Sequence, residues 1–153
     1  MNDATRYRVS ASSRVTAPAA RVYDIIADYH NGHPHIVPPQ FRNMQVERGG
    51  RGAGTVVSFE VKAFGRTQSF RHAVEEPEPG RVLVERDTNG SDATTFIVEP
   101  GAHDGESRVT ISSVLHSRSG LLGALERAMS SAFLQRLYRQ ELANLEAFAQ
   151  RGN

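Results

Sequence analysis

Short segments rich in β-branched and aromatic residues, separated by turn sequences, fill the middle of the chain and constrain its fold most. The breaks contain glycine, proline or the pair Asn89-Gly90, which is the strongest short signal for a β-hairpin. Strands that follow one another through such short turns pair antiparallel. This pattern predicts five strands of an antiparallel meander, at 55–63, 67–75, 81–87, 92–99 and 107–115.

The flanking segments add two strands and two helices. Residues 7–15 alternate between apolar and polar side chains, as in a strand with one buried face, and 43–48 form a further short strand. Apolar residues recur at helical spacing in 18–29, and 121–150 contain no proline and only Gly123. We therefore predict one α+β domain over 1–153, in which a curved antiparallel sheet of about seven strands wraps around a long C-terminal helix.

Composition excludes several classes of function. Eighteen basic and 17 acidic side chains leave a formal net charge of +1, which gives no electrostatic reason to expect a nucleic-acid partner. No cysteine is present, so disulfides and thiolate chemistry are excluded. We find no signal-peptide pattern and no apolar run of about 18 residues, and so expect a cytoplasmic protein without stable membrane insertion.

Known catalytic and cofactor motifs are also missing. The glycine cluster 49–54 lacks the GxGxxG spacing, and the β-branched residues 55–57 follow it instead of a helix, so we interpret it as a hairpin turn. The sequence has neither a Gly-x-Ser-x-Gly motif nor a closely spaced carboxylate pair. We predict no cofactor.

Three segments resemble the helix-grip START-like superfamily, especially its bacterial polyketide-cyclase/dehydrase and lipid-transport-type branch. They are the first strand with the Thr16–Tyr29 segment, the stretch His33-Pro34-His35-Ile36-Val37-Pro38-Pro39, and the terminal helix Leu121–Gln150. The resemblance covers nearly the whole chain. It implies a deep, largely apolar cavity between the sheet and the terminal helix. The fold hosts carriers, receptors and cyclases, so it does not by itself define a function.

Strand register predicts which side chains face that cavity. A two-residue turn at Gly65-Arg66 pairs Phe59 with His72 and places both on one face with the apolar Val57, Val61, Phe70 and Val74. The Pro77–Gly80 connection then pairs His72 with Val84, and Phe70 with Arg86, so that Arg86 also points inward. For strand 92–99 two registers remain, one with Thr95 and Ile97 inside and one with Phe96 and Thr94 inside.

His72, Arg86 and Ser113 are the candidate catalytic residues. Unpaired polar groups on an apolar face cost roughly 1–3 kcal/mol each, so they must find a partner in the protein, in water or in a ligand. His72 is either a core histidine satisfied by a carbonyl or serine, or a group that orients a ligand or transfers a proton. Arg86 lies at a strand end, from which it either enters the cavity or reaches solvent.

Three histidines, His30, His33 and His35, lie within six residues. No carboxylate in residues 29–46 completes a metal-ligand set, and Pro34 restricts the backbone between the last two, so we predict no metal site. A mobile cavity rim that displays these polar side chains is the preferred interpretation, with plain exposed loop residues as the alternative.

Two apolar stripes lie almost opposite each other on the terminal helix. One is Leu121, Leu122, Leu125, Ala128, Met129, Ala132 and Phe133; the other is Leu134, Leu137, Tyr138, Leu142, Leu145, Phe148 and Ala149. A straight helix on one sheet cannot bury both. We predict that 134–149 pack on the sheet. The helix then either bends or breaks near Ser130-Ser131, or 121–133 lean over the cavity mouth or join a second copy in a homodimer.

Three functions fit these observations. The first is binding, as carrier or sensor, of a small apolar or aromatic molecule such as a lipid, polyketide or isoprenoid. The second is a cyclase, aromatase or dehydratase that uses His72 as acid/base, and the third is a partner-binding protein with a filled cavity. The predicted ligand-binding residues are Tyr29, His33, His35, Val57, Phe59, Val61, Phe70, His72, Val84, Arg86, Ile111, Ser113, Met129 and Phe133.

Overall fold

Seven strands and two α-helices make up the fold, in a computed structural model that describes residues 4–151. The elements are β1 (Thr5–Val15), α1 (Ala19–Ala27), the 3₁₀ turn η1 (His33–His35), β2 (Phe41–Arg48), β3 (Val56–Ala63), β4 (Arg66–Glu78), β5 (Val82–Asp87), β6 (Ala93–Pro100), β7 (Ser107–Ser117) and α2 (Gly120–Gln150). This order confirms the predicted α+β class, including the short helix after strand one.

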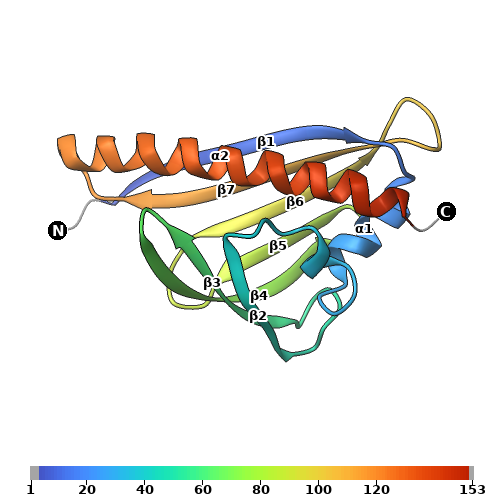
Figure 1. Ribbon diagram of the computed structural model, residues 1–153, viewed down its shortest axis with the longest axis horizontal. Coiled ribbons are helices and arrows are strands. Elements are labelled where there is room, and N and C mark those ends of the chain that lie inside the picture. Colours follow the sequence, from blue (N-terminus) through green and yellow to red (C-terminus); the bar gives the residue numbers. More distant parts are fainter. Residues whose placement is uncertain (1–3, 152–153) are drawn as a thin grey trace.

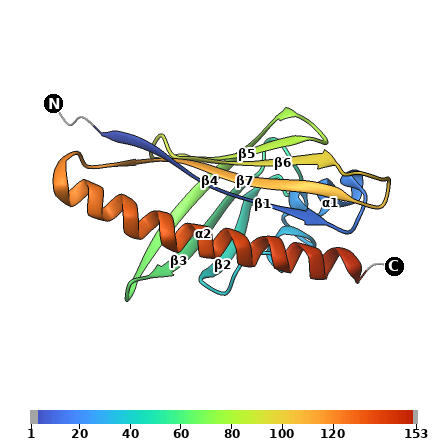
Figure 2. The same cartoon turned by 90° about the horizontal axis from the view of Figure 1, so that it is seen from above.

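The strands form one antiparallel sheet in the order β1-β7-β6-β5-β4-β3-β2. The sheet curves, and α2 runs along its concave side (Figures 1 and 2). α1 and η1 lie near the C-terminal end of α2, whereas the β3–β4 hairpin lies toward its first half (Figure 2). This is the helix-grip arrangement, in which the apolar face of the sheet and one face of the helix bury each other.

The β3–β4 hairpin turns one residue earlier than predicted. Phe64 and Gly65, with φ of 52° and 74°, form the two-residue turn, and Ala63 pairs with Arg66. His72 therefore pairs with Val57 and not with Phe59. Since this moves the register by two residues, every side chain keeps its face. The predicted inward orientation of His72 is confirmed.

The β4–β5 register overturns a second predicted pairing. His72 pairs with Asp87, and Val74 with Glu85, because β4 carries an extra residue in a bulge between Glu75 and Glu78. Glu85 consequently faces the concave side. The prediction that Val84 and Arg86 point into the cavity was wrong: Arg86 lies on the opposite face, where its Nε is 3.2 Å from the Glu75 carboxylate.

The β5–β6 connection decides the register that the sequence left open. The backbone N–H of Asp87 donates to the carbonyl of Asp92, so the loop is longer than the predicted two-residue Asn-Gly turn. Leu83 pairs with Phe96 and Glu85 with Thr94. Phe96 and Thr94 therefore face inward.

α2 is one continuous helix, which excludes one of the alternatives, a break at Ser130-Ser131. Its second half packs on the sheet as expected, with Leu137, Tyr138, Leu142, Leu145 and Ala149 buried. In the first half, the side chains of Leu121, Leu122, Leu125 and Met129 are 88%, 65%, 58% and 47% exposed. We call these four residues the exposed stripe. Its burial in a homodimer stays a prediction.

The first test concerns this exposed stripe. We expect the protein to self-associate through it, because contiguous apolar surface is rare on monomers. Sedimentation equilibrium should give a mass above that of one chain, and the double variant L122E/L125E should restore the monomer. Ala143→Glu, on an exposed position of the second half of α2, is the control and should not change the mass. A wild-type monomer at every concentration would contradict the dimer.

Candidate ligand cavity

A cavity of about 480 Å³ lies between the concave face of the sheet and α2. Phe64 and Arg66 of the β3–β4 turn and Ser130 of α2 line one end, and both turn residues are exposed, so this end is the mouth. His33, Glu85 and Glu141 line the other end and are only 2%, 8% and 4% exposed. The cavity therefore runs from an exposed mouth to a buried polar end.

Aromatic rings form much of the cavity wall. The ring of Phe59 lies 5.6 Å from those of Phe41 and Phe70 and meets His72 edge-on at 4.9 Å. Phe133 of α2 lies 5.3 Å from Phe64 at the mouth. These spacings are typical of packed aromatic pairs. The wall suits a flat or apolar molecule.

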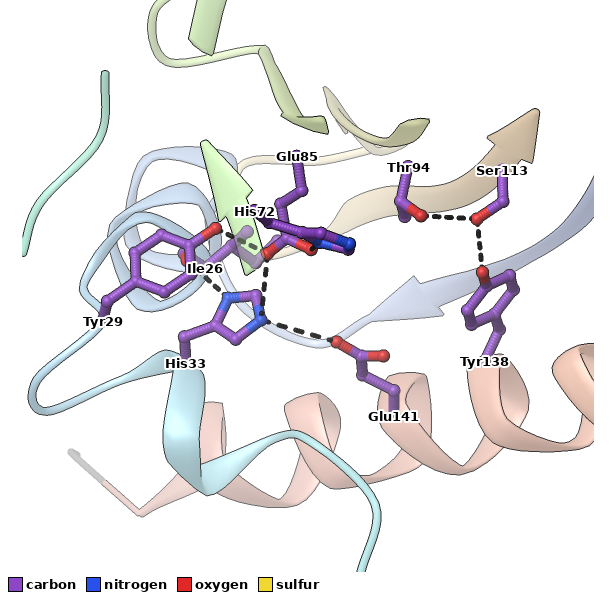
Figure 3. Close-up of polar contacts among 9 residues, drawn as sticks. All are labelled: Ile26, Tyr29, His33, His72, Glu85, Thr94, Ser113, Tyr138 and Glu141. Carbon is purple, nitrogen blue, oxygen red and sulfur yellow. Dashed lines mark hydrogen bonds and ion pairs between the residues drawn. The ribbon is translucent and has the colours of Figure 1, made fainter. Parts of the chain in front are cut away.

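Glu85 is the centre of the polar end, which Figure 3 shows in close-up. Its Oε1 accepts a hydrogen bond from the Tyr29 hydroxyl at 2.6 Å and lies 3.4 Å from Nε2 of His33. Its Oε2 lies 3.7 Å from Nδ1 of His72. One buried carboxylate thus faces donors from the α1–η1 segment and from β4.

His33 stands between the two buried carboxyl groups. Its Nδ1 donates to the carbonyl of Ile26 at 2.8 Å, because a carbonyl can only accept. Its Nε2 therefore faces Glu85 at 3.4 Å and Oε1 of Glu141 at 3.9 Å (Figure 3). Tyr29 stacks on the same ring with centroids 4.5 Å apart, which fixes its orientation.

The two carboxyl groups have opposite pKa shifts. Burial alone would raise the pKa of Glu85, but the neighbouring His33 and His72 rings and the Tyr29 hydroxyl lower it to about 2. Burial raises the pKa of Glu141 well above its ordinary value, and the nearby charge of Glu85 raises it further. These opposite shifts favour the charged form of Glu85 and the neutral form of Glu141.

A second polar group lies further along α2. The hydroxyls of Tyr138 and Ser113 are hydrogen-bonded, and Ser113 also bonds Thr94 at 2.6 Å (Figure 3). Burial raises the pKa of Tyr138 to about 12, although its hydrogen bonds to Ser113 and Thr94 act in the opposite direction. Ser113 is fully buried and does not line the cavity, so it holds Tyr138 in place.

The structure brings together seven of the predicted residues at the cavity surface, namely His33, Val57, Phe59, Val61, Phe70, His72 and Phe133. Tyr29, Ile111 and Ser113 are buried behind that surface. Val84 and Arg86 lie on the other face of the sheet, Met129 is exposed, and His35 stacks on Phe148 at 4.8 Å outside the cavity. His33 is thus a buried residue and not part of a rim.

The sequence analysis did not identify Glu85 and Glu141 as site residues. It named Tyr138 only as part of an apolar stripe and not as a polar group of the cavity. Glu141 occurs four residues after Leu137 and four before Leu145, inside the apolar stripe of α2. A carboxyl in such a stripe must be buried, and this signal was available in the sequence. Glu85 carried no such signal, because the bulge that turns it inward is a property of the paired strands.

The described part of the chain has neither a metal-binding cluster nor a membrane-spanning helix. No group of three His, Cys, Asp or Glu side chains in residues 4–151 is arranged to hold a metal ion. Over the same residues, no helix is both long and apolar enough to cross a membrane.

The fold and cavity define a helix-grip, ligand-binding type of protein, and comparison with known proteins agrees. Residues 6–150 match the family described as Polyketide cyclase / dehydrase and lipid transport. The chain therefore belongs to this family, which confirms the START-like resemblance. No curated protein sequence matches the chain.

Solved structures share the fold over nearly the full length. The KanY protein (ms6282) has a TM-score of 0.83 at 25% identity, covering 95% of this chain and 99% of that one. The Zhui aromatase/cyclase from Streptomyces sp. R1128 has a TM-score of 0.79 at 18% identity, covering 96% of this chain and 95% of that one. A START superfamily protein from Mycobacterium smegmatis has a TM-score of 0.75 at 15% identity, covering 95% of this chain and 99% of that one. At such identities the latter two show the fold alone.

The opposite pKa shifts of the two carboxyl groups predict opposite pH effects on stability. Because the pKa of Glu141 is raised, its stabilising contribution is present below about pH 4.5 and is lost as pH rises through the raised pKa. Glu141→Gln should therefore gain stability relative to wild type as pH rises from about 5 to 8. Urea unfolding across this range measures the difference.

Glu85→Gln is the matched comparison, and its effect on stability should depend on pH in the opposite direction. The lowered pKa of Glu85 gives stability that is present above its ordinary value of 4.5 and lost as pH falls toward about 2. The free energy of unfolding of the variant should be about 3 kcal/mol lower than that of wild type at neutral pH, because a buried charge network loses its anion. Equal and pH-independent effects of the two substitutions would contradict the assigned charges.

Proposed function

We propose that this protein binds a small apolar or aromatic molecule, such as a lipid, polyketide or isoprenoid, in the cavity between its sheet and α2. The observation that carries this proposal is the cavity itself, with about 480 Å³ of space and an aromatic wall that includes Phe59 and Phe70. Pockets for drug-sized molecules typically measure about 300–1,000 Å³ and are mostly apolar with a few polar groups. The open space also argues against a partner-binding protein whose cavity is filled by its own side chains.

A specific observation supports an enzyme as the second candidate. Nδ1 of His72 is buried without a hydrogen-bond partner and lies 3.7 Å from the Glu85 carboxylate, while the ring lines the cavity. A histidine oriented beside a carboxylate is suited to general acid–base catalysis. A cyclase, aromatase or dehydratase that uses His72 in this way fits the family description. Arg86 and Ser113 do not take part in this version, since neither reaches the cavity.

Cavity filling tests the binding function. Val61→Trp adds a large side chain at the cavity wall, so the affinity for the neutral fluorescent probe N-phenyl-1-naphthylamine should fall at least about tenfold. Lys62→Trp, on the adjacent exposed position of β3, is the matched control and should bind as wild type does. Fluorescence titration measures both affinities. Undiminished binding to the Val61 variant would show that the probe occupies another site.

A further inference from the structure

Glu141 is a buried acid that forms no hydrogen bond with any side chain of residues 4–151. Its side chain is 4% exposed and lines the inner end of the cavity. Nε2 of His33 lies 3.9 Å from its Oε1, beyond hydrogen-bond distance (Figure 3). Within residues 4–151 no side chain hydrogen-bonds this carboxyl group. A buried polar group of this kind costs free energy unless something else satisfies it.

The surroundings of Glu141 favour its protonated form. Glu85 carries the negative charge of the cluster and shares His33 with Glu141, so a second anion at this end would be repelled. Burial acts in the same direction and raises the pKa of Glu141. A protonated carboxyl has one O–H to donate. In this protonated form Glu141 is a neutral donor at the inner end of the cavity, and no side chain of residues 4–151 accepts its hydrogen bond.

Charges along the cavity disfavour an anionic ligand. Among the described residues that line it, Arg66 is the only arginine or lysine, and it lies at the mouth. Asp87 and Asp92 add two carboxylates to the wall, on the sheet side. His33 and His72 already face Glu85. A carboxylate head group at the inner end would meet no free cation, and burying it unpaired is costly.

We propose that the Glu141 carboxylic acid donates a hydrogen bond to a neutral oxygen of the ligand, best a ketone carbonyl, and that the cavity rejects ligands ending in a carboxylate. This inference rests on the proposed binding function and narrows its ligand class. Tyr138, one helical turn before Glu141 on α2, also lines the cavity, so the polar end extends along the helix. The aromatic wall holds the apolar part of the ligand, and Glu141 sets which end enters first.

Three naphthalene compounds of similar size test this selectivity. They are 2-acetylnaphthalene with a ketone, 2-ethylnaphthalene with no oxygen, and 2-naphthoate with a carboxylate, each measured by displacement of N-phenyl-1-naphthylamine at neutral pH. We expect the ketone to bind about tenfold more tightly than the hydrocarbon, as one buried hydrogen bond allows. The naphthoate should bind more weakly than both. Equal affinities for ketone and hydrocarbon, or tight binding of naphthoate, would overturn the inference.

Substitutions of Glu141 connect the selectivity to this side chain. Glu141→Leu should remove the tenfold preference for the ketone, whereas Glu141→Gln, which keeps an N–H donor, should retain part of it. Gln140→Leu, at the exposed neighbouring position, is the control and should behave as wild type. Thermal unfolding of each variant confirms that it is folded, and the Gln variant keeps the test valid where the Leu variant does not fold.

Infrared spectroscopy provides a readout that a purely structural role would not change. The carbonyl stretch of ¹³C-labelled 2-acetylnaphthalene should move to lower frequency in the wild-type complex and return to its value in apolar solvent in Glu141→Leu. An unshifted stretch in the wild-type complex refutes the hydrogen bond while leaving the cavity function standing. Failure of the probe and of all three compounds to bind would refute the proposed function itself, and this inference with it.

Discussion

A single extra residue in β4 determines the chemistry of the cavity. The bulge between Glu75 and Glu78 changes which residues of β5 face the concave side. If the register of the Glu78–Val82 pair continued along both strands without the bulge, Val84 and Arg86 would lie on the same face as His72. With it, Glu85 faces inward and Arg86 faces solvent. The inner end of the cavity is acidic for this reason.

Burial of Glu85 then organises the chain around it. An unpaired buried carboxylate is costly, and the segment after α1 supplies the Tyr29 hydroxyl and the His33 ring as partners. His33 in turn is held by the carbonyl of Ile26 and by stacking on Tyr29. The proline-rich stretch after α1 is therefore held at the polar end of the cavity, although its composition alone suggests a loose loop.

The two halves of α2 make different contacts. Leu137, Leu142 and Leu145 bury the second half on the sheet, and the same stretch contributes Tyr138 and Glu141 to the cavity. The first half passes the mouth with Phe133 turned inward against Phe64, while the exposed stripe faces away from the core. One unbroken helix thus closes the core, lines the cavity and presents an apolar surface.

Local patterns in the sequence were sufficient for the element order, the fold class and the inward orientation of Val57, Phe59, Phe70 and His72. Period-two alternation fixes a strand's buried face, and the two-residue error in the β3–β4 register preserved that face. Only the tertiary structure decided the orientation of Glu85, because a bulge is visible only once two strands are paired. It also decided the raised pKa of Glu141, since that depends on its burial and on the charge of Glu85, 56 residues away in sequence. Side-chain periodicity is a local property, whereas register across a bulge and the electrostatics of a buried cluster arise between segments that meet only in the folded chain.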